Sequence, residues 1–90
     1  MSHVIIRHKV ENYDTWRVAF DDHQSFRKEN GEQSARVFQS SDDPNDVLML
    51  FAWDSKDNVR RFMESDNLKE TMHKAGVIGK PEVHFLNGNE

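Results

Sequence analysis

The pattern of hydrophobic and polar residues predicts six elements in the order strand–helix–strand–strand–helix–strand. The first helix is predicted over residues 14–30, and the second starts after a cap at Asp54 or Ser55, restarts around residues 65–67 and ends at Gly76. Alternating or β-branched runs predict strands over residues 4–10, 34–40, 47–53 and 82–86. The last strand is entered through Lys80-Pro81, which favours extended backbone.

This order is that of the ferredoxin-like βαββαβ fold, an α+β class with a four-stranded antiparallel sheet and helices on one face. We expect residues 1–90 to form one such domain. The third strand, however, is apolar at every position from Val47 to Trp53, so both of its faces need cover. The second cover must come from another chain, which predicts a homodimer whose sheets meet face to face.

The first helix carries its apolar residues on one broad face. Gly31 follows it and suits a left-handed position at its carboxyl end. His23 lies near the centre of the apolar arc, where it is either a hydrogen-bonded core residue or a pocket residue. The arc itself comprises Tyr13, Trp16, Ala19, Phe20 and Phe26.

Composition narrows the possible partners and compartments. Twelve Lys and Arg stand against 16 Asp and Glu, and basic residues such as Arg7, Arg27 and Arg60 are scattered among acids, so no nucleic-acid partner is expected. The chain has no cysteine, which excludes disulfides and thiol catalysis. The longest apolar run is too short to span a bilayer, and no signal peptide is evident, so we expect a cytoplasmic protein without a membrane partner.

Three segments resemble the antibiotic-biosynthesis-monooxygenase-like group of the dimeric α/β-barrel superfamily. They are Tyr13-Asp14-x-Trp16 after the first strand, the run from Leu50 to Asp54, and the run from Phe62 to Glu70. The resemblance covers about residues 4–86 and implies a dimeric α/β barrel. It also implies a range of activities that includes cofactor-independent quinol oxygenases, haem-degrading enzymes and isomerases.

The haem-degrading branch of that group fits poorly. By resemblance it needs an Asn on the first strand, but Arg7 or His8 stands there. It also needs a Trp on the second helix, where Phe62 or Met63 stands. Only His73 comes near to the required His, so haem degradation is disfavoured.

His8 is the first candidate for acid–base chemistry. It is in phase with Val4 and Ile6 on the first strand, and is either a core or interface histidine or a general base facing the barrel interior. The first and last strands are neighbours in the ferredoxin-like order, so we expect His84 to lie near His8. His73 lies opposite the apolar stripe of its helix and is either solvated or close to a pocket mouth.

Aromatic residues supply the candidate binding surface. Phe51 and Trp53 share a face of the third strand, and Phe62 lies on the inner face of the second helix, so these rings form core, dimer interface or the wall of a cavity for a flat ligand. The histidines show no metal-ligand spacing, so neither metal nor cofactor is expected. Two functions remain: a cofactor-independent monooxygenase or isomerase acting on a small hydrophobic or aromatic compound, or a non-catalytic ligand-binding dimer.

Overall fold

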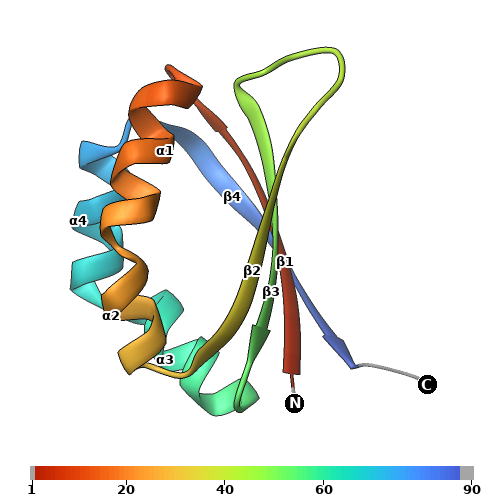
Figure 1. The fold of residues 1–90 in the computed structure, drawn as a ribbon, viewed down its shortest axis with the longest axis vertical. Coiled ribbons are helices and arrows are strands. Elements are labelled where there is room, and N and C mark those ends of the chain that lie inside the picture. Colours follow the sequence, from red (N-terminus) through yellow and green to blue (C-terminus); the bar gives the residue numbers. More distant parts are fainter. Residues whose placement is uncertain (1, 88–90) are drawn as a thin grey trace.

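A four-stranded antiparallel sheet carries four helices on one of its faces, and its other face is open (Figure 1). The computed structural model describes residues 2–87. In chain order the elements are β1 (Ser2–Val10), α1 (Tyr13–Asp22), α2 (Gln24–Glu29), β2 (Glu32–Gln39), β3 (Asp46–Trp53), α3 (Lys56–Glu64), α4 (Asp66–Lys74) and β4 (Val77–Asn87). The strands lie side by side as β2-β3-β1-β4, which confirms the predicted ferredoxin-like α+β fold.

The first predicted helix is divided into α1 and α2 at His23, a break that the periodicity did not predict. The backbone nitrogen of His23 still donates to the Ala19 carbonyl at 3.1 Å, and that of Arg27 donates to the His23 carbonyl at 3.1 Å. The helical phase therefore continues across the break. The amino-terminal cap is Asn12, whose side chain accepts from the Thr15 amide at 3.0 Å, so the prediction of a cap at residue 14 or 15 was wrong by two or three residues.

Gly31 follows α2 with a φ of +120°, so a glycine is required there as predicted. A second reason is the close approach of Asp54: a Cβ on residue 31 would overlap its carboxylate. Ser65 separates α3 from α4, accepting from the Leu68 amide at 3.2 Å and donating to the Phe62 carbonyl at 2.8 Å. This break was predicted, and it gives α4 a direction of its own.

The last strand begins at Val77, five residues before the predicted start. The sequence predicted Lys80-Pro81 only as the extended entry to the strand, but β4 lies at the edge of the sheet, where a residue without an N–H is tolerated inside a strand. The pairing of β4 with β1 shifts between Arg7 and Lys9. This irregularity lies beside His8.

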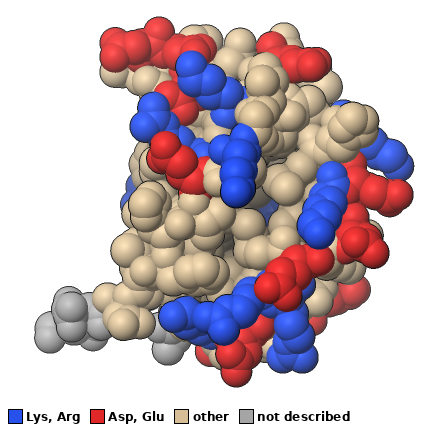
Figure 2. All heavy atoms as spheres, turned by 180° about the vertical axis from the view of Figure 1, so that it is seen from behind, with Lys and Arg blue, Asp and Glu red and all other residues tan. Residues whose placement is uncertain are grey.

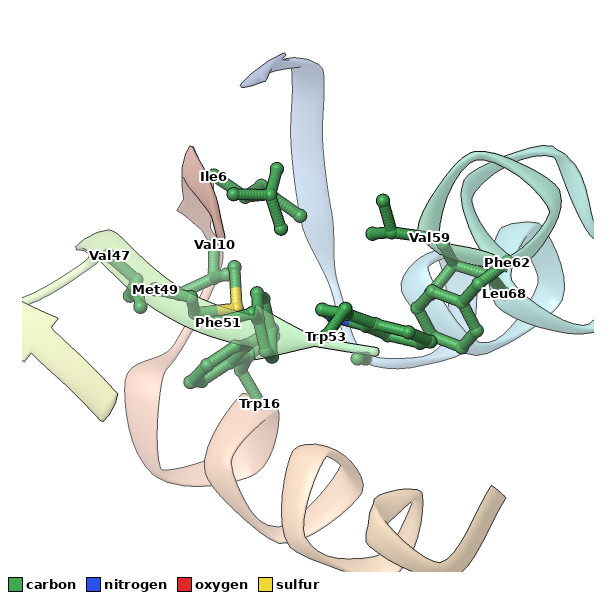
Figure 3. Packing of buried hydrophobic residues seen from close by; sticks show 12 residues of the cluster. Ile6, Val10, Trp16, Val47, Met49, Phe51, Trp53, Val59, Phe62 and Leu68 are labelled. Carbon is green, nitrogen blue, oxygen red and sulfur yellow. The ribbon is translucent and has the colours of Figure 1, made fainter. Parts of the chain in front are cut away.

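Side chains from the helix-facing side of β1 and β3 form the core with the inner faces of the helices. Figure 3 shows Trp53 at the end of β3 pointing toward Phe62 of α3, and their ring centroids are 5.0 Å apart. The buried members are Val4, Ile6, Val10, Trp16, Val47, Met49, Phe51, Trp53, Val59, Phe62, Leu68 and Ala75.

The open face of the sheet carries the residues of opposite phase. On β1 and β3 these include Ile5, Leu48 and Leu50, which are only partly exposed although no helix covers them. Phe38 of β2 and Leu86 of β4 are exposed at 41% and 39%. Strand β3 therefore carries apolar side chains on both faces of the sheet, as the sequence predicted.

Candidate functional site

An apolar pocket lies between the helix-facing side of the sheet and the helices. Its cavity is about 60 Å³, less than half of the roughly 150 Å³ of an engineered cavity that binds benzene. Strands β1 and β3 form its floor, and α1, α2, α3 and α4 form its walls. The lining residues are Ile6, His8, Trp16, Phe20, His23, Arg27, Met49, Phe51, Phe62, Met63, Leu68, Thr71, Met72 and Ala75.

His8 faces this pocket from the middle of β1. It is 5% exposed, and neither ring nitrogen has a hydrogen-bond partner within the described residues. Burial lowers the pKa of His8 to about 4, so the imidazole is neutral at pH 7. A buried polar ring without a partner is costly for the folded state, and a ligand hydroxyl could supply the missing hydrogen bond.

A row of stacked groups runs from His8 along the pocket wall. The His8 ring meets Trp16 edge-on at 5.5 Å between centroids, and Trp16 stacks on Phe20 at 4.9 Å with the planes 25° apart. The guanidinium carbon of Arg27 lies 3.7 Å from the centroid of Phe20. Such a row offers a planar ligand a flat surface between two polar groups.

Arg27 is held at the pocket by two short hydrogen bonds. Its Nε donates to Oε2 of Glu32 at 2.5 Å, and its Nη1 donates to the Phe20 carbonyl at 2.6 Å. Both Arg27 and Glu32 are buried, with 3% and 6% exposure. Burial lowers the pKa of Arg27, and the charge of Glu32 opposes that change. A guanidinium stays protonated in proteins, so Arg27 carries its positive charge.

One hydrogen bond joins the α1–α2 segment to α4 beside the pocket. His23 Nε2 donates to Oδ1 of Asn67 at 2.7 Å, linking the α1–α2 junction to the first turn of α4. Flexible Met63 and Met72 side chains complete this part of the wall.

Some of the sequence-predicted site residues meet at this pocket and others lie elsewhere. His8, Phe51 and Phe62 line it together. Trp53 is 1% exposed and lies behind Phe62, outside the lining. His73 is on the exposed side of α4.

His84 is on the open face of the sheet and opposite Ile5 in the register, so the expectation that it lies near His8 was wrong. His8 itself lies on the helix side of the sheet. The alternative that it faces the barrel interior, on the other side of the sheet, does not hold.

Arg27 is the pocket residue that sequence reasoning missed. It was counted among the scattered surface bases, yet it is buried. Its position carries a signal, because Trp16, Phe20, His23 and Arg27 follow one another at intervals of four, three and four residues, the period of one helix face. A charged residue in phase with an apolar stripe is a candidate for a buried, paired role.

Lys and Arg are interspersed with Asp and Glu on the face drawn in Figure 2, and no extended basic patch gathers there. Among residues 2–87, no group of three or more His, Asp or Glu side chains is arranged to hold a metal ion. None of the described helices is long and apolar enough to cross a membrane.

The fold and the pocket define a ferredoxin-like α+β protein with a mostly apolar site between sheet and helices. Residues 1–74 match the sequence profile of the antibiotic biosynthesis monooxygenase (ABM) family. The chain belongs to this family, as the three resembling segments predicted. No curated protein matches the chain significantly.

Solved structures share this fold at low sequence identity. SnoaB, a cofactor-independent oxygenase from Streptomyces nogalater, superposes with a TM-score of 0.79 at 14% identity over 99% of this chain and 93% of SnoaB. A candidate antibiotic biosynthesis monooxygenase from Bordetella bronchiseptica gives 0.83 at 15% identity over 99% and 97%. Another from Caulobacter crescentus gives 0.78 at 19% identity over 99% and 90%.

Proposed function

We propose that this protein is a homodimeric, cofactor-independent monooxygenase that oxidises a small phenolic aromatic compound. The observation that carries the proposal is His8, a neutral imidazole without a hydrogen-bond partner among residues 2–87, in a mostly apolar, ring-lined pocket. Membership of the ABM family supports this class of reaction, and so does the likeness in fold to SnoaB, a cofactor-independent oxygenase.

The chemistry requires the substrate to supply all the electrons. A phenol with a free para carbon reacts with O₂ to give a quinone and water: one oxygen atom bonds to the para carbon, and the other leaves as water with the O–H and C–H hydrogens. His8 accepts the hydroxyl proton, which makes the ring electron-rich toward O₂, and returns a proton to the departing oxygen.

A pKa of about 4 makes His8 a weak base in the empty pocket. In the complex, however, proton transfer forms an imidazolium beside a phenolate, so the new positive charge has a partner. Such a pair is favoured over an isolated cation in an apolar site. The low pKa also ensures that the base is unprotonated at neutral pH.

The present cavity is smaller than one aromatic ring needs, so binding must widen the pocket. Met63 and Met72 line the wall on the side of α3 and α4, and thioether side chains repack readily. Closure over the substrate would then exclude water from the electron-rich ring.

The homodimer follows from the open face of the sheet. Ile5, Leu48 and Leu50 lie at its centre, on the side that none of the helices within residues 2–87 covers. A second copy placed sheet to sheet would bury this apolar surface in both chains. Such a dimer leaves the pocket of each chain on the outer, helix side.

A non-catalytic ligand-binding dimer is the second candidate, and one observation favours it. A catalytic histidine is commonly oriented by a second polar group, but His8 has none within residues 2–87. The two functions share the pocket and differ in turnover.

The test is oxygen consumption with a panel of phenols that have a free para carbon, with His8→Gln as the variant and His73→Gln as the matched control on the exposed side of α4. His8→Gln should reduce turnover by about 100-fold or more, the usual effect of losing an acid–base group, while His73→Gln retains it. Binding of the panel without oxygen uptake by the wild type supports the ligand-binding dimer instead.

A further inference from the structure

Arg27 is the only Lys or Arg side chain among the described residues that line the pocket. Its guanidinium stacks on Phe20, a neighbouring wall residue, at 3.7 Å from the ring centroid. A guanidinium carries five N–H donors, and the hydrogen bonds to Glu32 and to the Phe20 carbonyl use two of them. Within residues 2–87, Nη2 has no hydrogen-bond partner.

The charge of Arg27 is already balanced by Glu32, which is buried beside it. A second carboxylate at this position would leave a net negative charge in an apolar site, which is strongly unfavourable. A neutral oxygen acceptor can use the spare N–H groups without adding charge. The ion pair therefore suits a carbonyl oxygen better than an acid.

We propose that Arg27 is a specificity-determining residue that selects aromatic ligands bearing a carbonyl oxygen. The ring would lie along Trp16 and Phe20, the carbonyl would accept from Nη2 of Arg27, and a hydroxyl at the far end of the ligand would reach His8. This inference rests on the proposed function, because it takes the same pocket as the ligand site, and it adds the ligand's second polar group.

The test compares three single-ring probes of similar size by ligand-observed NMR: acetophenone, its hydrocarbon analogue α-methylstyrene, and benzoate. The double variant Arg27→Met/Glu32→Met removes both charges, so that neither is left buried alone. The matched control is Arg17→Met, because Arg17 also lies over Phe20, at 5.7 Å, but its side chain is 41% exposed and lies outside the pocket lining.

In the wild type and in Arg17→Met, the ratio of the α-methylstyrene Kd to the acetophenone Kd should be about tenfold higher than in the double variant, the usual effect of one hydrogen bond to a charged group. If the double variant does not fold, Arg27→Lys serves instead, because it keeps the charge but loses the planar donor fork, and the ratio should fall severalfold.

Two results would overturn the assignment of Arg27 while leaving the pocket as the ligand site: an equal ratio in wild type and double variant, or benzoate binding more tightly than acetophenone. Failure of the wild type to bind any of the probes at millimolar concentration contradicts the proposed function itself, and Arg27 with it.

Discussion

Replacing His8 by leucine should remove a specific pH dependence of stability. Burial lowers the pKa of His8 to about 4 in the folded chain, against about 6.5 for an unperturbed imidazole. The unfolded chain therefore binds a proton at this residue where the folded chain does not. The resulting stability is fully present above pH 6.5 and is lost as the pH falls toward 4.

The magnitude follows from the two pKa values. Between pH 7 and pH 5 the unfolded imidazole becomes almost fully protonated while the folded one stays neutral, which lowers the free energy of unfolding by about 2 kcal/mol. This interval lies above the usual range of carboxylate titration. Contributions from other groups, present in both proteins, cancel in the comparison.

The assay is urea unfolding of wild type and His8→Leu at pH 7 and pH 5, at one protein concentration. Wild type should lose about 2 kcal/mol more than the variant over this interval. At pH 7 His8→Leu should be at least as stable as wild type, since leucine has no nitrogen to leave without a partner. Equal pH dependence in both proteins, or a loss of 1–3 kcal/mol at pH 7, would show that His8 is hydrogen-bonded in the core.

Three further predictions concern the core, the dimer and the pocket wall. Trp53→Ala should lower the free energy of unfolding by about 3–5 kcal/mol, because the ring is 1% exposed; an unchanged melting temperature would contradict this packing. Light scattering of the wild type should give twice the mass of the 90-residue chain. Leu50→Lys places a charge on the open face that the dimer would bury, so this variant should have the mass of one chain. The helix-side control Val18→Lys, at a residue 62% exposed, should leave the wild-type mass unchanged, and a monomeric wild type refutes the dimer. Asn67→Ala removes the hydrogen bond between the start of α4 and His23 of the pocket lining and should speed association of acetophenone in stopped flow; an unchanged rate means that this hydrogen bond does not limit ligand entry.

The sequence predicted the fold well because strand and helix patterns are local. The order of elements, the break near Ser65 and the glycine at residue 31 each depend on neighbouring residues alone. The start of β4 was missed because an edge strand tolerates Pro81, and an edge position is a property of the whole sheet.

The site was only partly predictable, since burial of polar side chains depends on tertiary partners. The phase of His8 with Val4 and Ile6 left both sides of the sheet open, and only the packed structure places His8 on the helix side. Arg27 looked like a surface base because its partner Glu32 belongs to the following strand and its stacking partner Phe20 to the preceding helix.

The central claim is that the pocket brings a phenolic substrate together with O₂ and a neutral base. Its most direct test is a reaction under oxygen-18 gas with a phenol that has a free para carbon and that the wild type consumes, followed by mass spectrometry of the quinone product. We predict that one oxygen-18 atom enters the quinone at the newly formed carbonyl, that the other appears in water, and that His8→Gln slows both together. A ligand that binds in the pocket and is recovered unchanged, or a product that takes its oxygen from water, contradicts it.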